Sequence, residues 1–275
     1  MKLKNSDIVV IIPIYKTILT ENEKISLNQC LAILKNYPIT FITYNTLETT
    51  EYIKICEKYS VQTNFVYFEK EFFNGISGYN SLMKDLNFYK TFSSYKYMLI
   101  YQLDAFVFKD ELLYWASKGY DYIGAPWFSG HKPYPEGKPE TCGNGGLSLR
   151  RIKWFIKVLS NKGYIETPLY FIANFLTEKK YSISRLIKDL RHCFSQKNKL
   201  SYFLQNGFIQ EDGFFCLTFH KRTFTPIKKP DWKTAASFSF EMSPSYLYNE
   251  INTLPFGCHA WEKYEYDDFW SKFIH

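Results

Sequence analysis

One aspartate stands at the end of an otherwise apolar segment, and carboxylates of this kind hold divalent cations. Asp104 interrupts the run YMLIYQLDAFVF, residues 97–108. A carboxylate is unfavourable to bury unless it has a cation or hydrogen-bond donors beside it. Hard divalent ions bind carboxylate and phosphate oxygens, so an ion at this point could anchor a nucleotide diphosphate and neutralise the charge on a departing one. The alternative for Asp104 is a helix cap or a turn residue.

Two later segments contain residues that could take part in the same chemistry. The segment QEDGFF, residues 210–215, places Glu211 beside Asp212. Adjacent carboxylates raise one another's pKa toward the range that suits a general base. The segment PFGCHAW places His259 after a glycine, and imidazole is a common ligand of manganese-like ions. A solvated helix start and an ordinary histidine are the respective alternatives.

A glycine-rich segment, GNGGLSLR at residues 143–150, precedes a strand-like stretch. Glycine permits positive φ and allows backbone N–H groups to come close to a ligand. The segment has neither the lysine of a Walker loop nor the GxGxxG order of a dinucleotide-binding loop. It is therefore either part of a ligand site or a glycine-rich bulge.

The first half of the sequence predicts the elements that would position these residues. Residues 8–15 form a β-branched run, which is typical of a strand buried on both faces of a mostly parallel sheet. Strands and helices then alternate. The predicted strands are 8–15, 39–45, 61–68 and 95–108, and the predicted helices are 22–36, 46–60 and 78–92, the last with Leu82, Leu86 and Tyr89 on one stripe. Such sheets bind ligands at the carboxyl ends of their strands, where Tyr15, Tyr44 and Asp104 would lie.

The second half of the sequence has a different composition and predicts different elements. Residues 119–150 are rich in Gly and Pro and predict loops and short strands over the sheet edge. A helical insertion is predicted at 165–205, and within it RLIKDLRHCF has the pattern of a short basic amphipathic helix. An ordinary surface helix is the favoured interpretation. Contact with an acceptor or a membrane surface through residues 179–199 is the alternative.

Composition narrows the classes of partner. The net charge of +7 is spread over 34 basic and 27 acidic residues without dense basic blocks, so we expect no nucleic-acid partner but an affinity for a nucleotide diphosphate or an anionic surface. The six cysteines include no CxxC pair, which favours reduced structural thiols. The N-terminal run IVVIIPIY is too short to span a bilayer. We therefore expect a cytoplasmic protein, with peripheral contact to the inner face of the cell membrane as an extension of that view.

Five segments in order carry a resemblance to known proteins. YQLDAFVF, DYIGAPW, GNGGLSLR, QEDGFF and PFGCHAW together resemble the DUF5672-type proteins, an uncharacterised bacterial family classed with glycosyltransferases that have a GT-A-like sheet. The resemblance covers roughly residues 8–160 and 205–262. The same layout is distantly similar to the β-1,4-galactosyltransferases, which have a DxD motif, a Gly-Gly segment, a Glu-Asp pair and a downstream metal-binding histidine.

The resemblance implies roles for individual residues. Asp104 matches the last Asp of the DxD motif, and His259 matches the metal-binding histidine. Asp212 matches the base. Gln102 stands where the first Asp of DxD would be, which makes contact to the donor or metal there weaker and metal dependence less certain. Gly145 and its neighbour Gly146 match the floor between donor and acceptor.

The sequence as a whole predicts an α/β, GT-A-like fold with a Rossmann-type, mostly parallel central sheet flanked by helices. We expect a single domain of residues 1–275, with a nucleotide-binding half at 1–110 and an acceptor and catalytic half at 111–275. The predicted function is transfer of a sugar from a nucleotide-sugar donor, preferably a UDP-sugar, to a saccharide or lipid-linked saccharide acceptor. We expect the transfer to invert the anomeric configuration of the sugar and to use Mn²⁺ or Mg²⁺ as cofactor. The pathway would be bacterial surface polysaccharide synthesis.

Two other functions stay open at this point. A nucleotidyltransferase acting on sugar phosphates also uses a metal carboxylate at a sheet edge, but the segment IIPIYKTILTEN lacks the basic glycine-rich loop such enzymes carry. A non-catalytic sugar-binding module would need only aromatic platforms.

The predicted site residues fall into four groups. The donor group is Pro13, Tyr15, Tyr44, Tyr79, Asn80, Gln102, Leu103 and Asp104. The acceptor group is Trp127, which would be an apolar sugar platform, with Asn144, Gly145 and Gly146. The base is Asp212, with Glu211 as second choice, and the metal ligands are Asp104 and His259.

Overall fold

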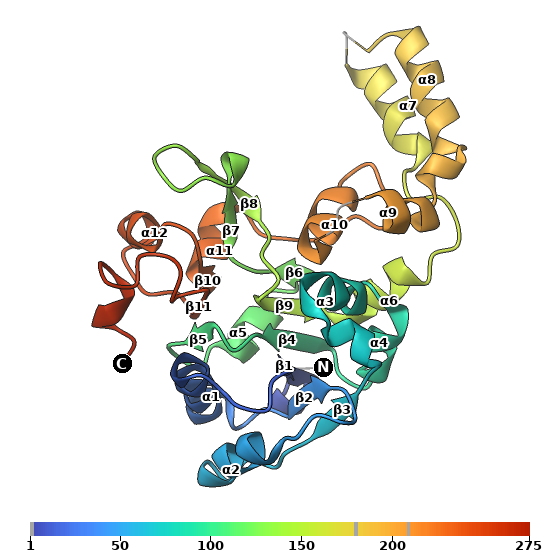
Figure 1. Ribbon diagram of the computed structural model, residues 1–275. Helices are drawn as coiled ribbons and strands as arrows, with labels where there is room; N and C mark the ends of the chain where they lie inside the picture. Colours follow the sequence, from blue (N-terminus) through green and yellow to red (C-terminus); the bar gives the residue numbers. More distant parts are fainter. Residues whose placement is uncertain (1–2, 179–180, 208–209) are drawn as a thin grey trace.

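A six-stranded mixed sheet lies at the centre of the computed structural model, which describes residues 3–178, 181–207 and 210–275 (Figure 1). Its strand order is β3-β2-β1-β4-β9-β6. The first four of these strands run parallel, whereas β9 is antiparallel to both of its neighbours. The strands are β1 (Ile8–Pro13), β2 (Ile39–Thr43), β3 (Phe65–Tyr67), β4 (Tyr97–Tyr101), β6 (Tyr122–Ile123) and β9 (Leu147–Arg151).

The predicted alternation of strands and helices in the first half is confirmed, with shorter elements. Every residue of β1, β2 and β4 is buried, as their apolar, β-branched runs predict. Helix α1 (Glu21–Leu34) begins with a capping box between Thr20 and Glu23, and α2 (Thr50–Lys58) follows β2. The first strands of the sheet and the helices between them therefore follow one another along the chain in the order that the sequence predicts.

The single helix predicted at 78–92 is wrong, because two helices occupy this region. Helix α3 spans Gly75–Met83 and α4 spans Leu86–Thr91. Asp85 separates them, since its carboxylate accepts hydrogen bonds from the backbone N–H groups at the start of α4. An N-cap of this kind begins a new helix rather than continuing the old one.

A second, three-stranded sheet has the order β10-β11-β5 and joins distant parts of the chain. Its strands are β5 (Ala105–Val107), β10 (Ser239–Phe240) and β11 (Gly257–His259). In the antiparallel pair His259 lies opposite Ala105, and in the parallel pair Cys258 lies opposite Phe240. Around this sheet the C-terminal part of the chain forms its own apolar core, which includes Trp261 and Trp270.

The Gly- and Pro-rich region 119–150 is only partly a cover for the sheet edge. Strands β7 (Pro126–Phe128) and β8 (Pro139–Cys142) do form a separate two-stranded ladder. The segment after GNGG is strand β9, however, which lies inside the central sheet between β4 and β6. This placement brings the glycines to the edge of the sheet where β4 ends, because Leu147 pairs with Tyr101.

The remaining helices include the predicted insertion at 165–205, where helices are confirmed. Helices α7 (Pro168–Thr177) and α8 (Ile183–Cys193) stand out from the body of the molecule as a helical pair (Figure 1), which we call the arm, residues 168–193. Residues 179–180, where the predicted contact region 179–199 begins, lie outside the described residues. The other helices are α5 (Leu112–Ser117), α6 (Ile152–Leu159), α9 (Leu200–Asn206), α10 (Glu211–Thr218), α11 (Trp232–Phe238) and α12 (Pro244–Ile251). Short 3-10 turns lie at Asn5–Asp7, Lys70–Phe73, Ser129–His131, Gln196–Asn198 and Trp270–Lys272.

Two further expectations concern cysteines and membrane spans. All six cysteines are free and buried, as reduced structural thiols would be. None of the helices in the described part of the chain combines the length and the apolar composition needed to cross a bilayer.

Candidate functional site

A cavity of about 600 Å³ opens at the carboxyl ends of β1 and β4. These two strands are neighbours, and the chain order of the sheet reverses between them, since β2 and β3 lie on one side of β1 and β4 on the other. In open α/β sheets, ligands bind in the crevice at such a point. The volume is in the range of small-molecule sites. Thirteen of the fifteen predicted site residues line the cavity, namely Pro13, Tyr15, Tyr79, Asn80, Gln102, Leu103, Asp104, Asn144, Gly145, Gly146, Glu211, Asp212 and His259.

The other two predicted residues, Tyr44 and Trp127, lie elsewhere. Tyr44 packs against Phe73 with ring centroids 5.7 Å apart, and Phe73 is the ring that reaches the cavity. Trp127 lies against Gly143, so closely that a Cβ on this glycine would come within 1.9 Å of the indole. Their placement gives no support to the predicted roles in donor and sugar binding.

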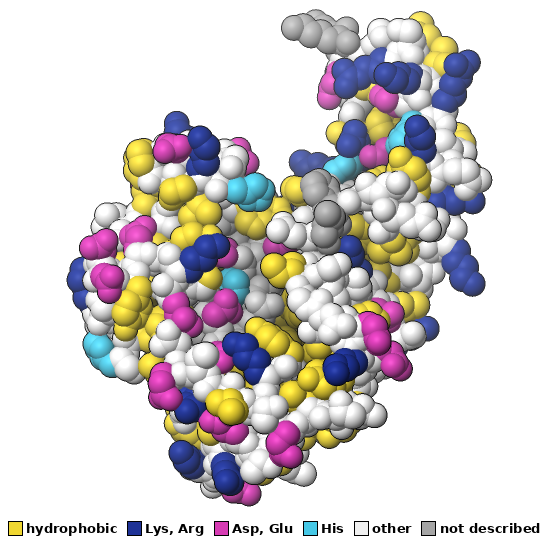
Figure 2. Space-filling view, in the orientation of Figure 1, with side chains coloured by type: hydrophobic (Ala, Val, Ile, Leu, Met, Phe, Trp, Pro, Cys, Tyr) yellow, Lys and Arg dark blue, Asp and Glu magenta, His cyan; other side chains and the backbone are white. Residues whose placement is uncertain are grey.

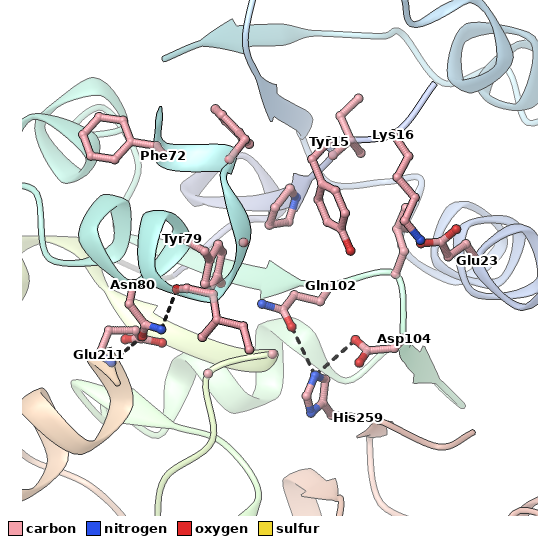
Figure 3. A pocket seen from close by; sticks show the side chains of 18 of the residues that line it. Tyr15, Lys16, Glu23, Phe72, Tyr79, Asn80, Gln102, Asp104, Glu211 and His259 are labelled. Carbon is pink, nitrogen blue, oxygen red and sulfur yellow. Dashed lines mark hydrogen bonds and ion pairs between the residues drawn. The ribbon is translucent and has the colours of Figure 1, made fainter. Parts of the chain in front are cut away.

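The two predicted metal ligands meet on one wall of the cavity (Figure 3). The Nε2 atom of His259 lies 3.1 Å from Oδ1 of Asp104 and 3.2 Å from Oε1 of Gln102. The register of the small sheet causes this meeting, because His259 pairs with Ala105, the residue after Asp104. Strand pairing thus brings together side chains that are far apart in the sequence.

A second acidic residue, Glu241, completes the surroundings of the imidazole. It follows β10 directly, and its carboxylate lies 3.4 Å from Nδ1 of His259 while also accepting a hydrogen bond from Asn144. Burial disfavours the charged imidazole, but Asp104 and Glu241 outweigh it and raise the pKa of His259 to about 10. Although burial opposes the change, the same ion pair lowers the pKa of Asp104. The two carboxylates therefore favour the protonated imidazole, and a metal ion bound at Nε2 would replace the proton there.

The glycine pair forms the floor between this wall and the opposite one. A Cβ on Gly146 would come within 1.9 Å of Nε2 of His259, and a Cβ on Gly145 would come within 2.2 Å of Oε1 of Glu211. The backbone is held at this position by a hydrogen bond from the N–H of Gln102 to the carbonyl of Gly146, 2.9 Å long. The glycines are thus required for close approach to two functional side chains.

On the opposite wall, Glu211 forms a buried ion pair with Arg150. The guanidinium lies 2.7 Å from Oε1 of Glu211, and both side chains are almost completely removed from solvent. Burial raises the pKa of Glu211, and the guanidinium opposes this rise by stabilising the carboxylate. The backbone N–H of Glu211 also donates to the side chain of Asn80. Glu211 is therefore a buried helix start, not a solvated one, and its carboxylate is already engaged.

Asp212 differs from Glu211 because it is only partly buried and has no basic partner of comparable closeness in the described structure. Its carboxylate accepts a hydrogen bond from the N–H of Gly213 at 2.6 Å. Burial, which is the larger effect, raises its pKa, while that hydrogen bond and the charge of Arg150 lower it. A partly buried carboxylate with a raised pKa at the rim of a cavity is suited to accept a proton.

The Asp104 wall fits a hard divalent cation on three grounds. Oδ1 of Asp104 is buried and faces Nε2 of His259 at 3.1 Å, so a cation bound by both atoms would replace that ion pair. The donor atoms are carboxylate oxygen, amide oxygen and imidazole nitrogen. Adjacent ligands of a six-coordinate ion with bonds of about 2.1 Å lie about 3 Å apart, and this matches the spacing of Nε2 from Asp104 and Gln102.

A metal ion at the Asp104 wall would need ligands in addition to the carboxylate of Asp104 and the imidazole of His259. Among residues 3–178, 181–207 and 210–275, no group of three or more His, Cys, Asp and Glu side chains is arranged to hold a metal ion. An ion here would complete its shell with Gln102 and with oxygens of a bound ligand. The substitution of the first DxD acid by Gln102 is therefore compatible with a cation, although it supplies less charge.

Some residues of the site were missed at the sequence level. Lys16 and Glu23 line the cavity and form an ion pair of 2.7 Å, and no motif marks them. Glu241 does have a signal, because an acid follows the alternating segment SFSF, residues 237–240, of which Ser239–Phe240 is strand β10. Arg150 has one too, since a charged residue within a strand that reads as buried needs a partner.

Comparison with known proteins adds a family and a fold. The sequence model of a family described as "Protein of unknown function (DUF5672)" matches residues 62–259. No curated protein matches the chain. The apo structure of mouse xyloside xylosyltransferase 1 aligns with 92% of this chain and 97% of its own, with 10% identity and a TM-score of 0.50. That likeness extends over nearly the whole chain, and the GT-A-like fold predicted from the sequence is confirmed.

Other solved structures align over a smaller part. Core-mannan synthase A from Aspergillus fumigatus, in its Mn/GDP form, has 12% identity and a TM-score of 0.39, and the alignment covers 55% of this chain and 60% of that one. For S. aureus TarS the identity is 11%, the TM-score is 0.36, and the coverage is 55% and 29%. The chain thus spans less than two thirds of these two structures.

The buried ion pair leads to a stability prediction. We expect Glu211→Gln to lower the free energy of unfolding by about 3 kcal/mol, because it leaves the buried guanidinium of Arg150 without a counter-charge. The matched variant Asp212→Asn, one residue along the same helix, should change it by less than about 1 kcal/mol. Urea unfolding of both variants measures the difference. Equal stabilities would contradict the structural role of Glu211.

Proposed function

The chain belongs to the DUF5672 family, and from this premise we propose that it is a glycosyltransferase that uses a nucleotide-sugar donor. One observation carries the proposal. The cavity at the strand-order reversal has Asp104 and His259 on one wall, Asp212 on the other and two glycines between them. The fold likeness to a xylosyltransferase over nearly the whole chain supports it.

Charge favours a cation together with the donor. Five carboxylates line the cavity, and the bases on its lining are Lys16, which is paired with Glu23, and His259, which is paired with Asp104. A diphosphate alone would meet a wall with an excess of negative charge. Asp104 and His259, with the amide of Gln102, would hold Mn²⁺ or Mg²⁺. The chemistry that such an ion would supply is stabilisation of the negative charge on the departing nucleoside diphosphate.

The protein's own residues supply the remaining functions. Asp212 accepts the proton of the acceptor hydroxyl as that oxygen bonds to the anomeric carbon and the bond to the nucleoside diphosphate breaks on the opposite face, a single displacement that inverts the anomeric configuration. Glu211, the second choice from the sequence, is held by Arg150 and serves to fix the start of α10. Gly145 and Gly146 let donor and acceptor approach each other over the backbone. Tyr15 and Tyr79 flank the nucleotide, for which uridine is our preferred base.

The acceptor, the location and the domain division remain proposals from the sequence. We keep a saccharide or lipid-linked saccharide acceptor, surface polysaccharide synthesis, a cytoplasmic location and a single domain with halves at 1–110 and 111–275. A nucleotidyltransferase would release pyrophosphate from a nucleoside triphosphate, whereas a transferase releases a nucleoside diphosphate from a nucleotide sugar. A sugar-binding module would release neither.

The first test is ligand binding with and without metal. In a thermal-shift panel of UDP-, GDP-, CMP- and dTDP-sugars, we expect one nucleotide class to stabilise the protein, more strongly with Mn²⁺. A ligand at one hundred times its Kd adds about 2.7 kcal/mol to the stability of the folded state. Asp104→Asn should lose the manganese-dependent part. Glu262→Gln, in the same cavity but outside the metal set, should retain it. A manganese effect that survives in Asp104→Asn would contradict the assignment.

The second test concerns the base. Because the pKa of Asp212 is raised, kcat/KM for sugar transfer should fall as the pH falls through a value above that of an ordinary aspartate. The carboxylate must be ionised to accept a proton, so activity is present above this pKa and lost below it. Asp212→Asn should reduce kcat by about 10²- to 10⁴-fold and remove this acid limb, with donor binding intact. A retained anomeric configuration in the product would remove Asp212 from the role.

The third test concerns the glycine floor. Gly146→Ala should displace the imidazole of His259, because the new Cβ would lie 1.9 Å from Nε2. We expect at least about a tenfold loss of affinity for the nucleoside diphosphate with manganese, in line with the loss of support for a metal ligand. Gly163→Ala is the matched control, since its Cβ would meet only the Asn161 side chain at 3.3 Å. Calorimetric titration measures both, and equal affinities would refute the close-contact argument.

A further inference from the structure

The arm carries a concentration of exposed apolar side chains that the cavity does not use. Five of the sixteen large apolar side chains that are exposed in the described structure lie within the arm, namely Leu169, Ile172, Leu176, Ile183 and Ile187. Leu169 and Leu176 on α7 are 71% and 75% exposed, and Ile183 on α8 is 64% exposed. Beneath them, Phe171, Tyr181 and Cys193 form a small separate core. The arm is therefore folded, and its outer apolar side chains have no partner within the described chain.

These side chains lie on one face of the arm. At 100° per residue, Leu169, Ile172 and Leu176 fall within an arc of about 60° on α7, and Ile183 and Ile187 fall within about 40° on α8. The side chains that pack the two helices together include Phe171 and Phe175 on α7 and Leu186 and Cys193 on α8. On each helix the exposed stripe lies roughly 100° further round the helix axis than these packing side chains, in the direction in which the chain winds. Antiparallel helices turn in opposite senses when seen from one end, so the two stripes emerge on the same side.

Positive charge accompanies the apolar face. The sequence of the arm, residues 168–193, contains five Lys and Arg against Glu178 and Asp189, a net charge of +3. Lys188 and Arg191 are exposed beside the stripe on α8. In Figure 2 dark blue side chains gather over the arm. Arg185 has a local partner, since its guanidinium lies 3.9 Å from Asp189.

We propose that this face of the arm docks the protein on the surface of an anionic lipid bilayer. Apolar side chains on a helix face enter the boundary between headgroups and acyl chains, and adjacent Lys and Arg side chains contact the anionic headgroups. A second copy of this chain would present the same excess of positive charge, which argues against self-association through this face. The arm is joined to the body next to α9 and α10, and α10 begins with Glu211 and Asp212 (Figure 1). Docking does not depend on the proposed transferase activity.

Vesicle flotation with the full chain tests the proposal. We expect the protein to float with vesicles of phosphatidylglycerol and phosphatidylcholine in equal parts, to bind phosphatidylcholine alone much more weakly, and to dissociate as salt is raised. The pair Lys188→Gln and Arg191→Gln should weaken binding about fivefold per side chain. The pair Leu169→Gln and Leu176→Gln should weaken it about tenfold or more.

Matched controls lie outside the arm. Ile18→Gln removes an apolar side chain that is 74% exposed, and Lys90→Gln removes an exposed charge on α4, so both should bind as the unchanged protein does. All variants should keep the melting temperature, because the replaced side chains are exposed. Failure of the unchanged protein to bind anionic vesicles would overturn the proposal. Undiminished vesicle binding by the double variant Leu169→Gln and Leu176→Gln would also overturn it. So would a dimer seen in sedimentation of the unchanged protein that this double variant abolishes, if the protein binds no vesicles.

Discussion

The register of the small three-stranded sheet is the constraint on which the site depends. Its antiparallel pair sets His259 opposite Ala105, and its parallel pair sets Cys258 opposite Phe240. The residues at the ends of these strands, Asp104, His259 and Glu241, consequently face one another. A slip by one residue would turn the imidazole to the other face of the sheet. The ion pairs then hold the imidazole between two carboxylates, and Gly146 fits against it because it has no side chain.

The two acids of the Glu-Asp pair have different roles because their surroundings differ. Glu211 is buried with Arg150, and a buried ion pair loses far more stability when one partner is removed than a surface pair does. Asp212, one residue along the same helix, keeps access to the cavity. One carboxylate therefore positions the start of α10, and its neighbour is left free for proton transfer in the activity that we propose.

The position of a site residue could be predicted from the sequence where that residue follows an apolar strand. Asp104 and Tyr15 follow buried strands that meet at one sheet edge, and both line the cavity. Tyr44 also follows such a strand, but β2 lies away from the strand-order reversal, so its ring packs behind Phe73. The pairing of Arg150 with Glu211 could not be predicted, because it depends on how α10 docks on β9. The helix break at Asp85 was missed because apolar periodicity continues across it.

We propose that the wall of Asp104, Gln102 and His259 holds a divalent ion together with a nucleoside diphosphate. Anomalous diffraction at the manganese edge, from crystals grown with manganese and UDP, or with the nucleotide that binds best, would locate this ion. We expect one strong peak within coordination distance of Asp104 and His259, with diphosphate oxygens beside it. A nucleotide in the cavity with no manganese at these residues, or with manganese bound elsewhere, would contradict it.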